Sequence, residues 1–131
     1  MNFLVDHNLR GHAVLLSGSI LSSGWLDWVL IRFITFDEMS LPINSDDRVV
    51  WRLAQSNQMI LLTANRSMKG DNSLEQVMRE EITSTSFPVI TISDADRLLT
   101  DSEYRERCAV RLVEIVLDIN VYMGVSRLFI P

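Results

Sequence analysis

The alternation of short, continuous apolar runs with amphipathic segments limits this chain to one class of fold. The runs lie at residues 2–6, within 28–36, and at 59–63, 88–92 and 127–130. Unbroken apolar residues are typical of strands that are buried on both faces, as in a parallel sheet. Because short runs also fit buried helices, the segments that flank them decide the assignment.

The segments between the runs have the spacing of helices. We expect helices at residues 9–23, 46–57, 72–83 and 100–122. Residues suited to the N-cap position are Ser45 or Asp46, Asn72 and Thr100. The last segment is the most regular, and its apolar stripe consists of Tyr104, Cys108, Leu112, Ile115, Ile119 and Tyr122 before a stop at Gly124.

Strands that alternate with helices predict an α/β fold. We expect a three-layer α/β/α sandwich with a mostly parallel central sheet of about five strands and right-handed crossovers. The chain has 131 residues, of which 47% are hydrophobic and 22% charged. This length and composition fit a single domain over residues 1–131 and exclude a disordered or low-complexity chain.

Composition also excludes several kinds of site. The single cysteine, Cys108, rules out a disulfide framework and a cysteine-rich zinc site, and only His7 and His12 are available as histidine ligands. A net charge of −5 argues against a generally basic nucleic-acid binder, although divalent cations can bridge carboxylates and phosphates. The longest apolar stretch, Trp25–Phe36, is too short and too charged to span a membrane, so we expect a soluble cytoplasmic protein.

Polar residues follow the predicted strands, where open parallel sheets bind their ligands. Asp6 to Asn8 follow the first strand, Asn65 and Arg66 the third, and Asp94 the fourth. Further acidic residues open the neighbouring helices, namely Asp46, Asp47, Asp71 and Glu75. Several carboxylates at one edge of a sheet would suit Mg²⁺ or Mn²⁺, and Arg66 could hold a phosphate.

Each of these residues also has a purely structural interpretation. The carboxylates can cap helices, and Asn65 and Arg66 can shape a turn. Cys108 lies on an apolar stripe and is expected in the core. The tryptophans, Trp25, Trp28 and Trp51, fit packing or a partner surface better than base stacking, because no basic groove accompanies them in the sequence.

The residues of three blocks resemble those of the PIN-like domain family. The opening FLVDHNL, Phe3–Leu9, resembles its first strand, which ends in Asp. The stretch from Asp46 to Ala54, followed by MILLTANR at Met59–Arg66, resembles a helix opened by Asp and a strand ending in Thr-x-Asp. Asp71–Glu75 resembles the start of the next helix in a prokaryotic branch, and the match covers most of the chain by order of elements.

The resemblance implies a PIN-like fold and a divalent-metal-dependent nuclease acting on RNA, often the toxin of a toxin–antitoxin pair. By position, Asp6 and Asp47, or Asp46 in its place, would bind Mg²⁺ or Mn²⁺. Asp71 or Glu75 would complete the metal shell, and Asn8 and Arg66 would contact substrate. Asn65 stands where the family commonly has Asp, and an amide is a weaker ligand that cannot act as a base.

Three hypotheses follow. The first is a metal-dependent phosphodiesterase in which Asn65 orients water or substrate beside the catalytic Asp6, Asp47 and Asp71. The second is a catalytically degenerate binding or assembly module with the same fold. The third, a phospho-receiver-like domain, lacks the aspartate it needs at the end of the third strand. A small antitoxin-like protein and a homodimer formed through Trp25–Phe36 are the expected partners.

Overall fold

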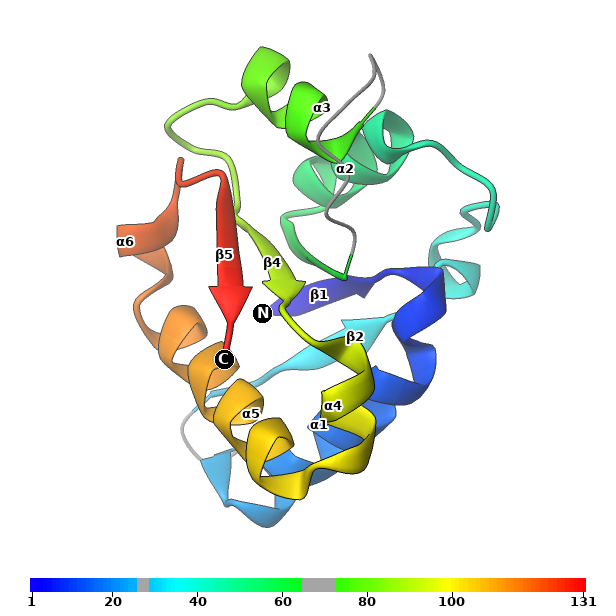
Figure 1. Ribbon diagram of the computed structural model, residues 1–131. Helices are drawn as coiled ribbons and strands as arrows, with labels where there is room; N and C mark the ends of the chain where they lie inside the picture. The colour runs from blue at the N-terminus through cyan, green and yellow to red at the C-terminus, as the bar shows by residue number, and fades with distance from the viewer. Residues whose placement is uncertain (26–28, 65–72) are drawn as a thin grey trace.

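The structure is a computed structural model that describes residues 1–25, 29–64 and 73–131 (Figure 1). Its strands are β1 (Asn2–Val5), β2 (Arg32–Ile34), β3 (Met59–Thr63), β4 (Val89–Ile92) and β5 (Arg127–Ile130). All five predicted strands are therefore present. The apolar run within residues 28–36 contributes only the three residues of β2.

The helices fall between these strands in the expected order. They are α1 (Arg10–Ser22), α2 (Asp47–Ser56), α3 (Leu74–Glu81), α4 (Ala95–Thr100), α5 (Ser102–Leu117) and α6 (Ile119–Tyr122), with 3₁₀ turns η1 (His7–Leu9) and η3 (Asp37–Met39). Among the described helices, none is both long and apolar enough to cross a membrane.

The strands form one sheet in the order β2-β1-β3-β4-β5, and every neighbouring pair is parallel. Successive residues of each strand point to opposite faces, so each strand supplies two separate cores. On β1, Leu4 packs under α2 and α3, whereas Phe3 and Val5 pack under α1, α4 and α5. Burial on both faces explains the continuous apolar runs and confirms the three-layer α/β/α sandwich (Figure 1).

The expectation of right-handed crossovers is wrong for one connection. The first three connections use α1, α2 and α3 and all wind in the same, right-handed sense. Between β4 and β5 the chain advances in the same direction as between β3 and β4, yet α4 and α5 cross the opposite face, beside α1 (Figure 1). This connection is therefore left-handed, against the strong general preference. The contacts of α5 with α1 bury the apolar stripe of α5 there.

The helix predicted from Thr100 to Tyr122 begins at Ser102 and is divided near Asp118 into α5 and α6. Asp101 ends α4 and caps α5, because its carboxylate accepts hydrogen bonds from the backbone N–H groups of Glu103 and Tyr104. The break inside the predicted range occurs at Asp118, between α5 and α6. Cys108 is fully buried as expected, and burial raises the pKa of its thiol to about 11.

The apolar stretch predicted to support a homodimer is largely used within the fold. Of its described residues, Trp25, Val29, Ile31, Phe33 and Ile34 pack against the two cores. Leu30 is the clearest exception and is 65% exposed. Most of the described apolar side chains of this stretch therefore pack within the fold, and the homodimer stays a prediction.

Candidate functional site

The strand order creates a crevice between β1 and β3. The chain leaves β1 over one face of the sheet through α1, and it leaves β3 over the other face through α3. At such a switch point the two connections diverge and leave room outside the carboxyl ends of the strands, where α/β proteins bind ligands. Asp6 and Thr63 stand at these two strand ends.

A small pocket occupies this crevice, and we call it the Asp6–Asp47 pocket. Its volume is about 60 Å³, enough for a few water-sized groups. The polar residues that line it are Asp6, Ser45, Asp47 and Thr63, and its walls are completed by Phe36, Ile43, Val50, Leu61 and Leu74. Two carboxylates far apart in the sequence therefore line one pocket.

Asp6 is held in place by the strand that pairs with β1. Its backbone N–H donates to the carbonyl of Leu62 at 2.9 Å, which extends the β1–β3 pairing by one residue. The hydroxyl of Thr63 then donates to Oδ2 of Asp6, also at 2.9 Å. Among the described residues, the one hydrogen bond to Asp6 Oδ1 is a long one of 3.5 Å, from the N–H of Asn8. Asp6 thus caps η1 and keeps oxygen lone pairs for a ligand.

The two adjacent aspartates at the start of α2 have different positions. Asp46 is exposed and caps the helix, because its Oδ1 accepts a hydrogen bond of 2.9 Å from the N–H of Val49. Asp47 is the first helical residue, is partly buried and lines the pocket. The sequence left Asp46 and Asp47 open as candidates. In the structure Asp46 is the helix cap and Asp47 is the pocket residue.

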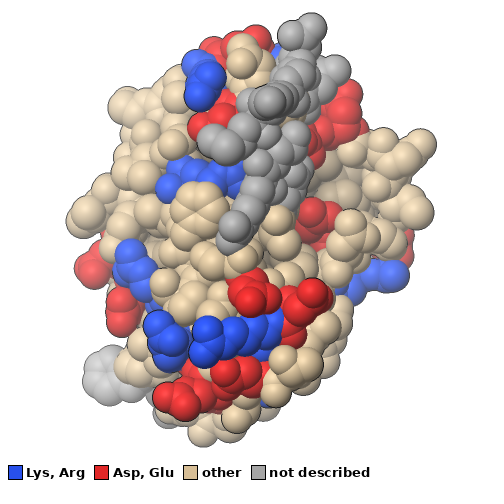
Figure 2. Space-filling model, viewed as in Figure 1, with Lys and Arg blue, Asp and Glu red and all other residues tan. Residues whose placement is uncertain are grey.

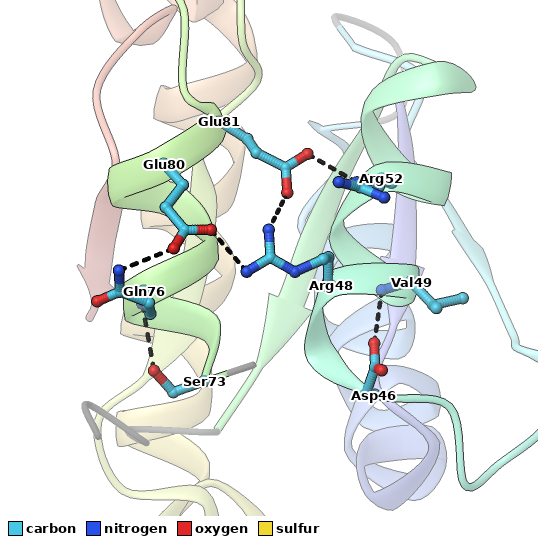
Figure 3. A network of polar contacts seen from close by, with 8 residues as sticks. All are labelled: Asp46, Arg48, Val49, Arg52, Ser73, Gln76, Glu80 and Glu81. Carbon is cyan, nitrogen blue, oxygen red and sulfur yellow. Dashed lines mark hydrogen bonds and ion pairs between the residues drawn. The ribbon is translucent and has the colours of Figure 1, made fainter. Parts of the chain in front are cut away.

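An ion-pair network connects α2 to α3 (Figure 3). Arg48 pairs with Glu81 and, at 2.7 Å, with Glu80; Arg52 also pairs with Glu81 at 2.7 Å. Hydrogen bonds from Gln76 and Arg48 hold the pKa of Glu80 below its ordinary value, and those from Arg52 and Arg48 do the same for Glu81. The network fixes the helix that carries Asp47 against the neighbouring helix.

Glu75 lies in a different cluster, formed with Arg127 and Thr91. The Nε of Arg127 is 3.6 Å from Oε2 of Glu75, and its Nη1 donates to the hydroxyl of Thr91 at 2.7 Å. The side chain of Arg127 is 7% exposed and that of Glu75 is 21% exposed. The structure therefore pairs Glu75 with a buried guanidinium and does not bring it into the lining of the Asp6–Asp47 pocket.

The remaining predicted residues are placed as follows. Asn65, Arg66 and Asp71 lie outside the described residues. The side chain of Asn8 is exposed, and Asp94 caps α4 through the N–H of Arg97. His7 is partly buried, with its ring centroid 6.5 Å from that of Phe36 in the pocket wall.

The donor set of the pocket suits a hard divalent cation. Two carboxylates and two hydroxyls offer oxygen atoms only, and proteins often bind Mg²⁺ through one or two carboxylates together with water and substrate phosphate. Within the described ranges, no three His, Cys, Asp or Glu side chains are grouped closely enough to hold a metal ion. The carboxylates and hydroxyls of the pocket therefore fit a divalent ion that keeps much of its coordinated water.

The charge pattern elsewhere is mixed. Figure 2 shows basic and acidic side chains side by side over α4 and α5, in the lower half of the view. Arg97 pairs with Asp101 and Arg111 with Glu114 in this region. Such interleaved pairs are typical of a solvated surface and do not make a basic patch for a polyanion.

No family model, curated protein or solved structure matches this chain. The functional interpretation depends on its own residues. Sequence reasoning did not select Thr63, Ser45 or Arg127. The threonine and arginine had a detectable signal, since each is a polar residue within or at the end of an apolar strand.

Proposed function

We propose that this chain is a divalent-metal-dependent, ribonuclease-like phosphodiesterase of the PIN-like kind, acting in the cytoplasm. The observation that supports it is the convergence of Asp6 and Asp47 on one small pocket at the β1/β3 switch point. The two residues come from different elements, and both are among those to which the family resemblance assigns metal binding, with Asp46 as the alternative to Asp47. Convergence of this kind is unnecessary for two residues that only cap helices.

Each pocket residue has a defined part in the proposed site. Asp6 and Asp47 would hold the Mg²⁺ or Mn²⁺, and Thr63 orients Asp6 by donating its hydroxyl hydrogen to Oδ2. A bound ion of this kind polarises a phosphodiester and lowers the pKa of a bound water. The apolar wall, with Phe36, Val50 and Leu61, restricts water around the carboxylates and so strengthens their electrostatic interactions.

Cleavage assays on three single variants test the proposal. Wild-type protein should cleave an unstructured RNA in Mn²⁺, and Asp6→Asn and Asp47→Asn should each lower the rate by about 100-fold or more, as expected for loss of a metal ligand. Asp46→Asn is the matched control because it removes the same charge one residue away, and asparagine also caps helices well. The control should retain activity.

Two results would contradict the mechanism. Unchanged Mn²⁺-dependent cleavage by Asp6→Asn would exclude the carboxylate from the metal site. Equal loss in Asp46→Asn and Asp47→Asn would indicate a general effect on α2 and would remove the distinction between cap and pocket residue.

A catalytically degenerate binding module is the second candidate. Asn65 replaces the aspartate common in the family, and within the described ranges only two carboxylates line the pocket. Mn²⁺ binding that depends on Asp6 and Asp47 without any RNA cleavage would favour this candidate. An antitoxin-like protein partner remains a prediction of the resemblance.

A further inference from the structure

Helix α5 carries a row of charged side chains that is basic in its first half and acidic in its second. Arg107, Arg111, Glu114 and Asp118 follow one another at steps of four, three and four residues, and this spacing puts side chains on one side of a helix. Asp118 is the C-cap of α5. Arg107, Glu114 and Asp118 are exposed, and Arg111 is partly buried. We call these four residues the α5 row, which has a positive end and a negative end.

The charges at the two ends of the α5 row differ from those in its middle. Arg111 and Glu114 pair with each other at 3.3 Å, and Arg111 also donates to the hydroxyl of Tyr122. The side chains of Arg107 and Asp118, in contrast, form no ion pair or hydrogen bond with the described residues. A row with a cation at one end and an anion at the other complements the same row running in the opposite direction.

Apolar side chains lie beside the α5 row. Val110 and Leu117 each come three residues after a member of the row, and they are 37% and 53% exposed. A hollow of about 340 Å³ is lined by side chains of α5, Arg107 and Arg111 among them, and by Pro131, which follows β5. The α5 row therefore borders the side of the molecule on which β5 ends.

Strand β5 is at an edge of the sheet. In the order β2-β1-β3-β4-β5, no strand of the described chain lies beyond it, and an edge strand is a template for a strand of another chain. α5 runs in the direction opposite to β5 and packs against one face of the sheet (Figure 1). A second copy that pairs with β5 in antiparallel fashion about a two-fold axis therefore brings the two α5 helices together, antiparallel and on the same face.

One two-fold axis is compatible with both contacts. Leu128, near the middle of β5, comes three residues before Pro131, which is about 10 Å along a strand. The same distance spans about seven residues of a helix, counted from the part of α5 that lines the hollow beside Pro131. An axis at Leu128 therefore passes α5 within about one helical turn of the midpoint between Arg111 and Glu114.

We propose that a second copy of this chain binds at the β5 edge, where the two sheets join into one and the two α5 rows pair in reverse. About an axis at the midpoint of the row, Arg107 of each copy meets Asp118 of the other, and Arg111 lies opposite Glu114. The apolar side chains beside the rows are then buried between the two helices. The partner is thus a second copy because the charged surface complements itself.

This surface differs from the one expected at Trp25–Phe36, because β2, which lies in that stretch, is at the opposite edge of the sheet. Strand β4 separates β5 from the crevice between β1 and β3. The inference therefore goes beyond the proposed function and does not depend on it.

Sedimentation equilibrium on charge-reversed variants tests the surface. Wild type should form a dimer, and Arg107→Asp and Asp118→Arg should each weaken it by about tenfold or more, because each places like charges opposite one another twice in the dimer. The double variant exchanges the two charges, restores both ion pairs and should regain most of the wild-type affinity. Arg107→Gln and Asp118→Asn, which only remove a charge, should weaken the dimer by about two- to tenfold.

Two further variants are the matched controls. Arg79→Asp makes the same charge change as Arg107→Asp on the exposed surface of α3. Leu30→Arg places a charge in the stretch that the sequence favoured for a homodimer, at a side chain that is 65% exposed. Both variants should dimerise as wild type does. Circular dichroism checks that every variant is folded.

Four results would overturn the proposal. The first is a wild type that stays monomeric at millimolar concentration, and the second is a dimer that neither reversal weakens. The third is a folded double variant that dimerises no better than the single reversals. The fourth is a dimer lost in Leu30→Arg and kept in both reversals, which would assign the interface to Trp25–Phe36.

Discussion

Two polar clusters lie side by side on the α2/α3 face of the sheet, and they differ in how their carboxylates are compensated. Thr63 on β3 pairs in register with Thr91 on β4, so the clusters are neighbours across one strand boundary. In the first, Asp6 receives hydrogen bonds from the uncharged donors Thr63 and Asn8. In the second, Glu75 faces the buried guanidinium of Arg127.

The carboxylates of Asp6 and Glu75 differ in what balances their negative charge. A buried or partly buried charge needs a countercharge or strong hydrogen bonds, and the fold itself supplies one to Glu75. For Asp6 the described protein supplies only neutral donors and an adjoining pocket that contains Asp47. We therefore infer that the first cluster is built for an external cation, whereas the second stabilises the attachment of α3 to the sheet.

Replacing Arg127 should have the largest effect on stability. Arg127→Met leaves Glu75 without its countercharge and Thr91 without its donor, and breaking such a pair costs roughly 3 kcal/mol of unfolding free energy. Asp6→Asn should change stability by only about 0.5 kcal/mol, because asparagine can still accept from Thr63. Urea unfolding followed by circular dichroism measures both.

A double variant checks the reason for the loss. Arg127→Met combined with Glu75→Leu removes both charges and should recover much of the lost stability. If the double variant is as unstable as the sum of the two single variants, the pair is not the cause. Stability that falls as much in Asp6→Asn as in Arg127→Met would remove the contrast between the clusters.

Acid should weaken the contact between α2 and α3 by a smaller amount. The pKa values of Glu80 and Glu81 lie below the ordinary 4.5 in the folded protein, through Gln76, Arg52 and Arg48. Their stabilising contribution is therefore complete above that value and is lost as pH falls through the lowered pKa values. Arg48→Gln should make the fall in melting temperature below about pH 5 shallower.

The control for the acid experiment is Arg79→Gln, on the same helix as both glutamates. Arg79 is exposed and forms no ion pair with the described residues. The melting temperature of its variant should therefore fall in acid as that of wild type does. If the melting temperature of Arg48→Gln falls in acid as steeply as that of wild type, the α2–α3 network contributes nothing measurable to stability.

The element order was predictable from sequence because local signals agreed with the final fold. Strands β3 and β5 begin and end where their apolar runs do. The start of α5 was predicted to within two residues, with Asp101 in place of Thr100 as its cap, whereas the break at Asp118 was not predicted, because the apolar stripe continues past it. The left-handed β4–β5 connection was not predicted either, because it depends on the face of the sheet against which α5 packs.

The site was predictable only in part, for a similar reason. Strand-end position selected Asp6, and the start of the next helix selected Asp46 and Asp47 without deciding between them. Sequence alone left Glu75 as an equal candidate, because its removal from the pocket depends on Arg127, which is distant along the chain. Such long-range ion pairs leave no periodic signal.

The location of Mn²⁺ in crystals soaked with the ion, found by anomalous scattering, is the most direct test of the central claim. The account predicts a peak within bonding distance of carboxylate oxygens of both Asp6 and Asp47, which is lost in crystals of Asp47→Asn and kept in Asp46→Asn. A peak beside Glu75 or at an unrelated surface carboxylate, with none at the Asp6–Asp47 pocket, would contradict it.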